Sequence, residues 1–205
     1  MGIEKDNTLQ DGSLHEKNVD WRRPSGVQIW GGWALGSLLV VVCTLSFVWS
    51  VSLSFRWDVL QSILRWHFSD VRHMQISELA KQMQKNKGTK SGKSSLLLLD
   101  IREDREFAVS HLPGAVHIRP STKMAFLVKR YRLEQPIVVY CSLGFRSGQF
   151  ARKLNKAGFQ KVYNLEGSIF RWANEGYTLM KGKRKVKRVH PYSAFWGRFL
   201  EPDYH

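Results

Sequence analysis

Short apolar runs alternate with amphipathic stretches through the second half of the chain. Continuous apolar residues at 96–99 and 137–140 predict strands that are buried on both faces. Shorter strands are expected at residues 74–76, 116–118 and 161–163. Apolar residues at helical spacing predict helices that begin near residues 77, 121, 149 and 169. Strands that alternate with helices predict an α/β fold, in which helices cover both faces of a parallel sheet.

The chain near its beginning has a different pattern, that of a membrane span. No charged residue occurs between Pro24 and Phe55, and Trp, Leu, Val and Phe dominate the second part of this run. About 20 such residues suffice to cross the hydrocarbon core of a bilayer, and Trp residues near both ends are typical of interfacial anchors. The leader is acidic and the run is long, unlike a signal peptide. We therefore expect one uncleaved transmembrane helix at residues 27–56, before the α/β domain.

The remaining segments follow from composition. Residues 1–26 form a polar tail, residues 57–73 an amphipathic linker, residues 74–180 the folded domain, and residues 181–205 a basic and then apolar tail. Residues 181–188 hold six cations, which is typical of a solvated segment, although such a run can also contact anionic headgroups. The apolar residues after it need burial, either on the domain or against a membrane.

Charge and cysteine content narrow the partners and the compartment. The net charge is +15, and residues 1–26 contribute four Lys and Arg against five Asp and Glu, so the basic charge lies in the body. Beside a membrane anchor this charge favours an anionic lipid surface; no recognised nucleic-acid motif accompanies it, and we expect no nucleic-acid partner. Cys43 and Cys141 lie far apart, which argues against a disulfide framework and for a reducing compartment. Lysines after the span also favour this side, because cytoplasmic segments beside a span carry an excess of Lys and Arg. We therefore expect a single-pass protein with its domain on the cytoplasmic side.

Cys141 is the candidate nucleophile. It follows a buried strand and precedes a helix, where backbone N–H groups and the helix dipole favour a negative charge. A thiolate at such a position has a lowered pKa, and the thiolate is the reactive form. Arg146 adds a cation that can bind an oxyanion with two hydrogen bonds. A cysteine at a strand end is more often a small buried hydrophobe, but the Gly-x-Arg-Ser context favours the nucleophile.

Several motifs resemble, in the same order, those of the rhodanese-like sulfurtransferases. They are Leu97–Arg102, Glu106-Phe107, His111–Ala115, the Tyr140–Ser147 loop, and segments between Gly158 and Gly176. The resemblance covers residues 74–180. Ser110 and Ser168 stand where the family has glycine; neither lies in the loop, so only local turn geometry is affected.

The resemblance implies a rhodanese-like fold and sulfur transfer through a persulfide on Cys141. The expected donor resembles thiosulfate, and the expected acceptor is a thiol, on a small molecule or a protein, or cyanide. No cofactor and no metal are expected. Six residues run from Cys141 to Arg146, as in the sulfurtransferase members, whereas the phosphatase-like members have a loop one residue longer. Two alternatives stay open: a non-catalytic membrane-tethered binding module, and a persulfide carrier for one protein partner.

Roles follow for single residues near the nucleophile. The expected substrate and anion-binding loop comprises Ser142, Leu143, Gly144, Phe145 and Arg146. The expected supporting residues are Asp100, Arg102, His111 and Ser147. Asp100 and Arg102 are interpreted as a structural ion pair, and His111 as a residue that fixes the Pro-Gly turn. Ser142 and Ser147 either hydrogen-bond the persulfide or cap the helix. Leu143 and Phe145 either form an apolar rim or pack beneath the loop.

Overall fold

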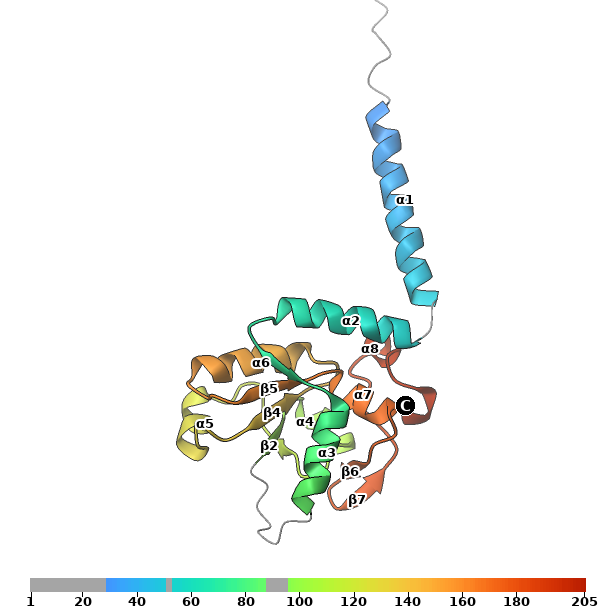
Figure 1. Ribbon diagram of the computed structural model, residues 1–205. Coiled ribbons are helices and arrows are strands. Elements are labelled where there is room, and N and C mark those ends of the chain that lie inside the picture. Colours follow the sequence, from blue (N-terminus) through green and yellow to red (C-terminus); the bar gives the residue numbers. More distant parts are fainter. Residues whose placement is uncertain (1–28, 51–52, 88–95) are drawn as a thin grey trace, which may run out of the picture. The chain divides into compact units, whose positions relative to one another are not determined.

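The computed structural model describes residues 29–50, 53–87 and 96–205 (Figure 1). The chain divides into two units, residues 1–46 and 47–205, and each is described by itself. The tail expected at residues 1–26 lies outside the described residues.

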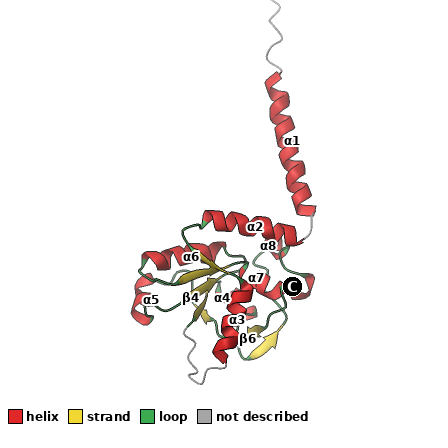
Figure 2. Ribbon diagram, in the orientation of Figure 1, coloured by secondary structure: helices red, strands yellow, loops and turns green. Residues whose placement is uncertain are grey.

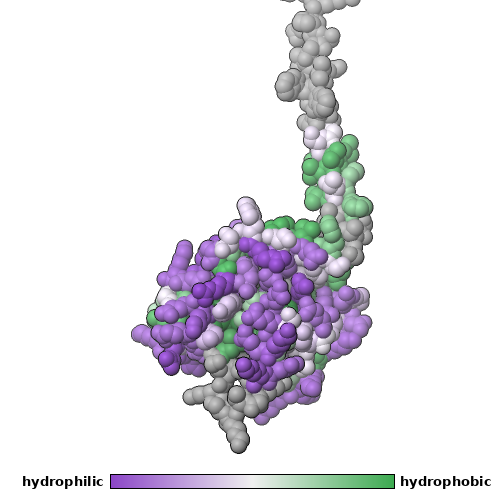
Figure 3. All heavy atoms as spheres, viewed as in Figure 1, coloured by the Kyte–Doolittle hydropathy of each residue, from purple (hydrophilic) through white to green (hydrophobic). Residues whose placement is uncertain are grey.

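The segment predicted as one helix, residues 27–56, contains parts of two described helices, and residues 51–52 between them lie outside the described residues. Helix α1 spans Ile29–Ser50, and helix α2 spans Leu53–His67. Helix α2 is amphipathic and buries Trp57, Gln61 and Leu64 against the folded domain. On α1, the described side chains, at residues 36–47, are all exposed, and Figure 3 shows their hydrophobic character. Among the described residues, no helix has both the length and the apolar character needed to cross a membrane.

The five-stranded sheet confirms the predicted parallel architecture. Its strands are β1 Arg72–Met74, β2 Leu97–Asp100, β3 Val116–His117, β4 Ile137–Tyr140 and β5 Val162–Leu165. They lie in the order β1-β5-β4-β2-β3, and every neighbouring pair is parallel. The register places Asp100 beside Tyr140, so the C-terminal ends of β2 and β4 meet at one edge. The first strand lies two residues earlier than predicted, because Ile76 begins the next helix.

Helices lie on both faces of this sheet (Figure 2). They are α3 Ile76–Lys87, α4 Asp104–Val109, α5 Met124–Arg130, α6 Phe145–Lys156 and α7 Ser168–Asn174. Helix α4 was not predicted from the sequence; a capping box formed by Glu103 and Glu106 closes its first turn. Helix α6 begins four residues earlier than predicted, directly after Gly144.

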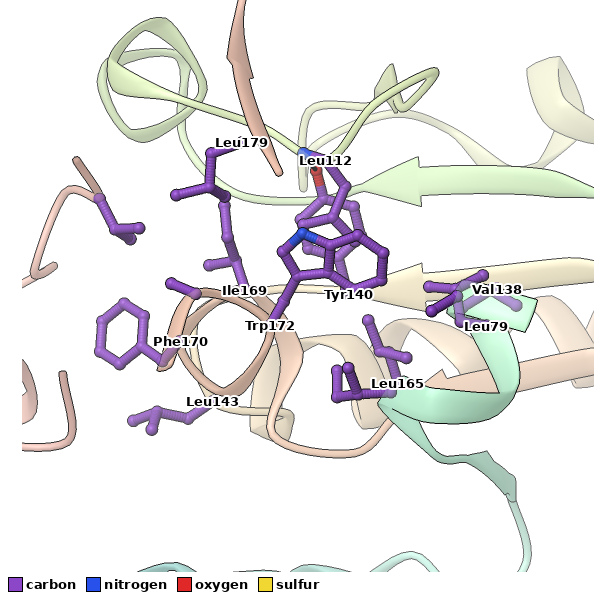
Figure 4. Packing of buried hydrophobic residues seen from close by; sticks show 14 of the residues in the cluster. Leu79, Leu112, Val138, Tyr140, Leu143, Leu165, Ile169, Phe170, Trp172 and Leu179 are labelled. Atoms are coloured by element: carbon purple, nitrogen blue, oxygen red, sulfur yellow. Dashed lines mark hydrogen bonds between the residues drawn. The ribbon is translucent and has the colours of Figure 1, made fainter. Parts of the chain in front are cut away.

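Two hydrophobic clusters fill the space between sheet and helices. Leu98, Val138 and Tyr140 belong to the first cluster. Figure 4 shows Val138 and Tyr140 there with side chains of α3 and α7. Their neighbours Leu99 and Val139 belong to the second cluster, with side chains of α5 and α6. Because successive side chains in a strand point to opposite faces, a strand buried on both faces is apolar throughout.

The end of the chain packs on the domain. Strands β6 Leu179–Lys181 and β7 Arg184–Val186 form an antiparallel hairpin that displays the basic residues. Helix α8 Ala194–Gly197 and a 3-10 helix at Pro202–Tyr204 follow. Val189, Phe199 and Leu200 are buried in the first cluster, and the Phe199 ring lies 5.3 Å from that of Trp57 in α2. The sequence left open whether these apolar residues pack on the domain or against a membrane, and in the structure they pack on the domain.

Candidate active site

Cys141 lies between β4 and α6, as the sequence predicts. The four residues Cys141–Gly144 form the turn, and Gly144 is the N-cap of α6 with φ of 121°. L-residues rarely adopt that φ, and a Cβ at Gly144 would lie 3.3 Å from the Leu64 side chain. Glycine is therefore required for this turn. Neither Ser142 nor Ser147 caps the helix, so that interpretation of the two serines is wrong.

Hydrogen-bond donors surround the Cys141 sulfur. The Gly144 N–H donates to Sγ at 3.1 Å, and Ser147 Oγ lies 3.4 Å from Sγ. Ser147 Oγ also lies 2.7 Å from Asn164 Oδ1, so its single proton serves one of two acceptors. Asn164 in turn donates to the Gly144 carbonyl at 3.0 Å, which fixes the loop.

The surroundings of Cys141 favour the thiolate. Burial raises the pKa of Cys141, but the charge of Arg146 and hydrogen bonds from Ser147 and Gly144 outweigh burial. The net pKa lies below the ordinary value of a cysteine thiol. A larger fraction of the sulfur is therefore in its nucleophilic form at neutral pH.

Arg146 is held by a buried carboxylate that the sequence analysis missed. Arg146 Nη1 and Nη2 each donate to one oxygen of Glu106 at 2.8 Å. Ser142 Oγ donates to Glu106 and accepts from Arg146, both at 2.8 Å. Burial raises the pKa of Glu106, but the hydrogen bonds and charge of Arg146 outweigh burial and lower it overall. One signal was available: Glu106 follows β2, whose C-terminal end lies beside that of β4.

A cavity of about 400 Å³ opens over Cys141. It is lined by Leu60, Ile63, Leu64, Cys141, Ser142, Leu143, Phe145, Arg146, Tyr192 and Trp196. Leu143 and Phe145 both line the cavity; Phe145 is exposed at the rim, whereas Leu143 is also buried in the first hydrophobic cluster. The walls from α2 and from the C-terminal segment, residues 189–205, were not predicted, because amphipathic or aromatic character indicates burial without giving its location.

The ring of Tyr192 lies against the guanidinium of Arg146. Its ring centroid lies 4.5 Å from the guanidinium carbon, a cation–π distance. Its backbone φ is 62°, a left-handed conformation that is uncommon for a bulky residue. Arg146 is thus held between Glu106 and an aromatic ring from the end of the chain.

Asp100 and Arg102 form a separate, fully buried ion pair outside the cavity. Arg102 Nη2 lies 2.7 Å from Asp100 Oδ2 and donates to the Ser110 carbonyl at 2.6 Å. Beside them, burial and the charge of Asp100 raise the pKa of Tyr140 well above its usual range. The Tyr140 hydroxyl accepts a hydrogen bond from the Leu112 N–H at 3.1 Å. This network joins β2, β4 and the segment before β3.

His111 also lies outside the cavity. Its ring stacks on Phe107 at 4.3 Å, and its Nδ1 lies 3.1 Å from the Leu112 carbonyl oxygen. Its backbone exchanges two hydrogen bonds of 2.8 Å with Met180. These contacts hold the segment before the Pro-Gly turn against the start of the hairpin.

Ser168, one of the two departures from the family pattern, does contact the loop. Its φ is 51°, so a residue with a side chain occupies a left-handed position. Its hydroxyl oxygen accepts from the Cys141 N–H at 3.1 Å and lies 3.1 Å from the Leu165 carbonyl. The expectation that this substitution affects only local turn geometry is therefore wrong.

Comparisons with known proteins agree with the geometry. Residues 76–175 match the family model of the rhodanese-like domain. An uncharacterised protein of Bacillus subtilis, YqhL, is 33% identical over 99 residues, which are 48% of this chain and 71% of YqhL. Both α2 and the C-terminal segment lie outside the residues that match the family model.

Two solved structures show similarity at lower identity. The BH2092 protein of Bacillus halodurans is 21% identical with a TM-score of 0.51, over 67% of this chain and 96% of BH2092. A rhodanese-like domain protein of Staphylococcus aureus is 23% identical with a TM-score of 0.44, over 54% of this chain and 97% of that protein. The similarity to BH2092 supports the fold alone.

Proposed function

Since this chain belongs to the rhodanese-like family, we propose that it is a sulfurtransferase that carries sulfur as a persulfide on Cys141. The observation that carries the proposal is the state of the sulfur. Cys141 Sγ lies at the start of α6, accepts from the Gly144 N–H at 3.1 Å, and has a lowered pKa. A cysteine that served only as a packed hydrophobe would need none of these donors.

The first half-reaction loads the sulfur. The Cys141 thiolate attacks the outer sulfur of a donor such as thiosulfate, and a new S–S bond forms to Sγ. The S–S bond of thiosulfate breaks, and its electron pair leaves with sulfite. The Gly144 N–H and the positive end of the α6 dipole are oriented toward the charge that the persulfide carries.

The second half-reaction unloads the sulfur. An acceptor thiolate or cyanide attacks the outer sulfur of the persulfide, and the bond between that sulfur and Sγ breaks. The electron pair returns to Sγ and restores the thiolate, which the lowered pKa of Cys141 favours as a leaving group. Covalent catalysis of this kind divides one difficult displacement into two easier ones.

The test uses the full chain with Cys43→Ser, so that Cys141 is the one remaining cysteine. The protein is treated with thiosulfate, and its intact mass is measured before and after addition of a thiol; Cys141→Ser in the same background is the control. We expect a gain of one sulfur atom and release of one sulfite, both absent from the control. Failure of both thiosulfate and inorganic polysulfide to load Cys141 would contradict the proposal and favour a non-catalytic binding module.

We further propose that α1 associates with a lipid bilayer and that the domain lies on the cytoplasmic side, where a thiol stays reduced. Two features support association: α1 contains no charged residue, and its described apolar side chains are exposed. The test is flotation of the full chain with phosphatidylcholine vesicles at high salt, which screens the basic domain. A Leu39→Lys and Val42→Lys double variant should lose flotation, whereas Phe126→Lys on the domain should retain it. Equal flotation of all three proteins would exclude a role for α1.

A further inference from the structure

We propose that the thiol that takes sulfur from Cys141 is carried on an uncharged, apolar small molecule, which the cavity over Cys141 binds. This inference rests on the proposed function and adds the class of acceptor. It depends on the composition of the cavity wall, on the charge inside it and on its size.

Three parts of the chain contribute apolar side chains to the wall of the cavity. Helix α2 contributes three aliphatic side chains at helical spacing: Leu60, Ile63 and Leu64. The C-terminal segment contributes Tyr192 and Trp196, and the loop contributes Leu143 and Phe145. Contact with such a wall favours an apolar ligand, because the ligand and the wall both bury apolar surface away from water.

The charge inside the cavity argues against an anionic or cationic body. Among the described residues that line the cavity, Arg146 is the only cationic side chain. Its guanidinium is held by both oxygens of Glu106, which is fully buried, and by the ring of Tyr192. The pair has no net charge, so the cavity offers no free charge to a second ionic group on the acceptor. Burial of such a group without a partner would oppose binding.

The size of the cavity fits a small molecule. Its volume of about 400 Å³ lies in the lower part of the range of about 300–1,000 Å³ that is usual for small-molecule sites. In the transfer step, the acceptor thiolate attacks the outer sulfur of the Cys141 persulfide. The acceptor gains an S–S bond, the bond to Sγ breaks, and Sγ departs as a thiolate. The apolar body lies against α2 and Trp196 while the acceptor sulfur reaches the persulfide.

The experiment measures how the rate of transfer depends on the apolar length of the acceptor. The full chain with Cys43→Ser is loaded with sulfur, and removal of that sulfur is followed by intact mass for ethanethiol, butanethiol and hexanethiol. These thiols differ in apolar length and little in reactivity. We expect kcat/KM to rise about two- to fourfold for each methylene that becomes buried. 3-Mercaptopropionate, which carries a charge, should react no faster than ethanethiol.

Two variants of α2 locate the effect. Ile63 lines the cavity and is 55% exposed, whereas Val59 on the same helix is 36% exposed and lines no part of it. Ile63→Gln should flatten the dependence on chain length, and Val59→Gln should leave it unchanged. Both positions are on the surface of the helix, so we expect both variants to fold. The unfolding curve of each variant verifies this.

The outcomes separate this inference from the proposed function. A persulfide that forms normally, with rates that do not depend on acceptor length, overturns the apolar acceptor and leaves the sulfurtransferase intact. A length dependence that survives Ile63→Gln unchanged also overturns it, because another surface must then bind the acceptor. Failure of any donor to form a persulfide overturns both proposals.

Discussion

At the scale of single residues, opposing forces act on the Cys141 sulfur. Burial alone would hold the thiol neutral, because a charge loses its hydration in the interior. The charge of Arg146 and the donors from Ser147 and Gly144 act in the opposite direction and prevail, so the pKa of Cys141 is lowered. Each unit of pKa corresponds to about 1.4 kcal/mol between the two protonation states.

Removal of the Arg146 charge should therefore raise the pKa of Cys141. In the Cys43→Ser background, the rate of alkylation by iodoacetamide should rise with pH, and Arg146→Gln should shift that profile to higher pH. The control is Arg152→Gln, which removes an arginine of the same helix that pairs with Asp70 instead. Identical pH profiles for the Arg146→Gln variant and for the Cys43→Ser protein that keeps Arg146 would show that the charge of Arg146 does not act on Cys141.

Glu106 makes the stability of the domain depend on pH. Its pKa is lowered in the folded state, so its contribution is present above the unfolded pKa of about 4.3 and is lost as pH falls through the folded pKa. Glu106→Gln leaves Arg146 without its buried partner, and at pH 7 we expect a loss of about 3 kcal/mol in the free energy of unfolding.

Urea unfolding at several pH values tests this prediction. The difference between Glu106→Gln and the native protein should shrink as pH falls below the folded pKa. The control, Glu175→Gln, breaks a partly exposed pair with Arg171 and should cost less than about 1 kcal/mol. A constant difference across the pH range would mean that packing of Glu106, and not its charge, stabilises the domain.

At the scale of elements, Gly148 allows α6 to pack closely against Phe68, the residue that follows α2. An added Cβ at Gly148 would lie 2.7 to 2.9 Å from three atoms of the Phe68 ring, which is fully buried. Contacts that short require the ring or the helix to move. Gly148 lies in the first turns of α6, so this contact also supports the loop that carries Cys141.

Gly148→Ala should destabilise the domain by about 1–3 kcal/mol, since overpacking a filled core has that cost. The sign is the informative part, because Gly→Ala inside a helix normally stabilises by about 0.5–1 kcal/mol. Thermal unfolding measures the change, and Gln149→Ala at the exposed neighbouring position should have little effect. A stabilised Gly148→Ala variant would contradict the packing described for Phe68.

The elements that the sequence predicts well are those whose burial is continuous. Strand β4 was placed at its observed bounds because it is apolar over its whole length and turn-forming residues bound it. Strand β1 was misplaced because Ile76 is apolar for a different reason: it begins α3 and packs in the first cluster. Helix α4 was not predicted because its six residues are too few to show a helical period. The charge of Glu106 also suggests a surface position, although the side chain is buried.

At the scale of the whole molecule, the site combines segments that are distant in sequence. The loop of Cys141 could be predicted because its residues are contiguous and form a known motif. Glu106, the α2 residues and Tyr192 could not, because periodicity indicates that a side chain is buried without indicating its partner. The last residues of the chain illustrate this limit: their aromatic character predicted burial, and only the fold gives its location.

The C-terminal segment should also stabilise the domain. Phe199 is 4% exposed and packs against Trp57, whereas Phe195, four residues earlier, is 51% exposed. Phe199→Ala should lower the free energy of unfolding by about 3–5 kcal/mol. Phe195→Ala should lower it by less than about 1 kcal/mol. Urea unfolding measures the free energy of unfolding of the two variants. If Phe199→Ala lowers it as little as Phe195→Ala, residues 195–199 contribute as a surface segment only.

Glu106 behaves as a ligand tethered to Arg146. Any dissolved anion that seeks the same two N–H groups must displace a carboxylate that is already in place, and tethering gives such a group an effective concentration of roughly millimolar or above. We therefore expect Glu106 to compete with anionic reagents for the N–H groups of Arg146. The thiosulfate concentration needed for half-saturation should accordingly be high. It should decrease in acid, because protonation of Glu106 releases Arg146. Uncharged reagents should bind without this competition.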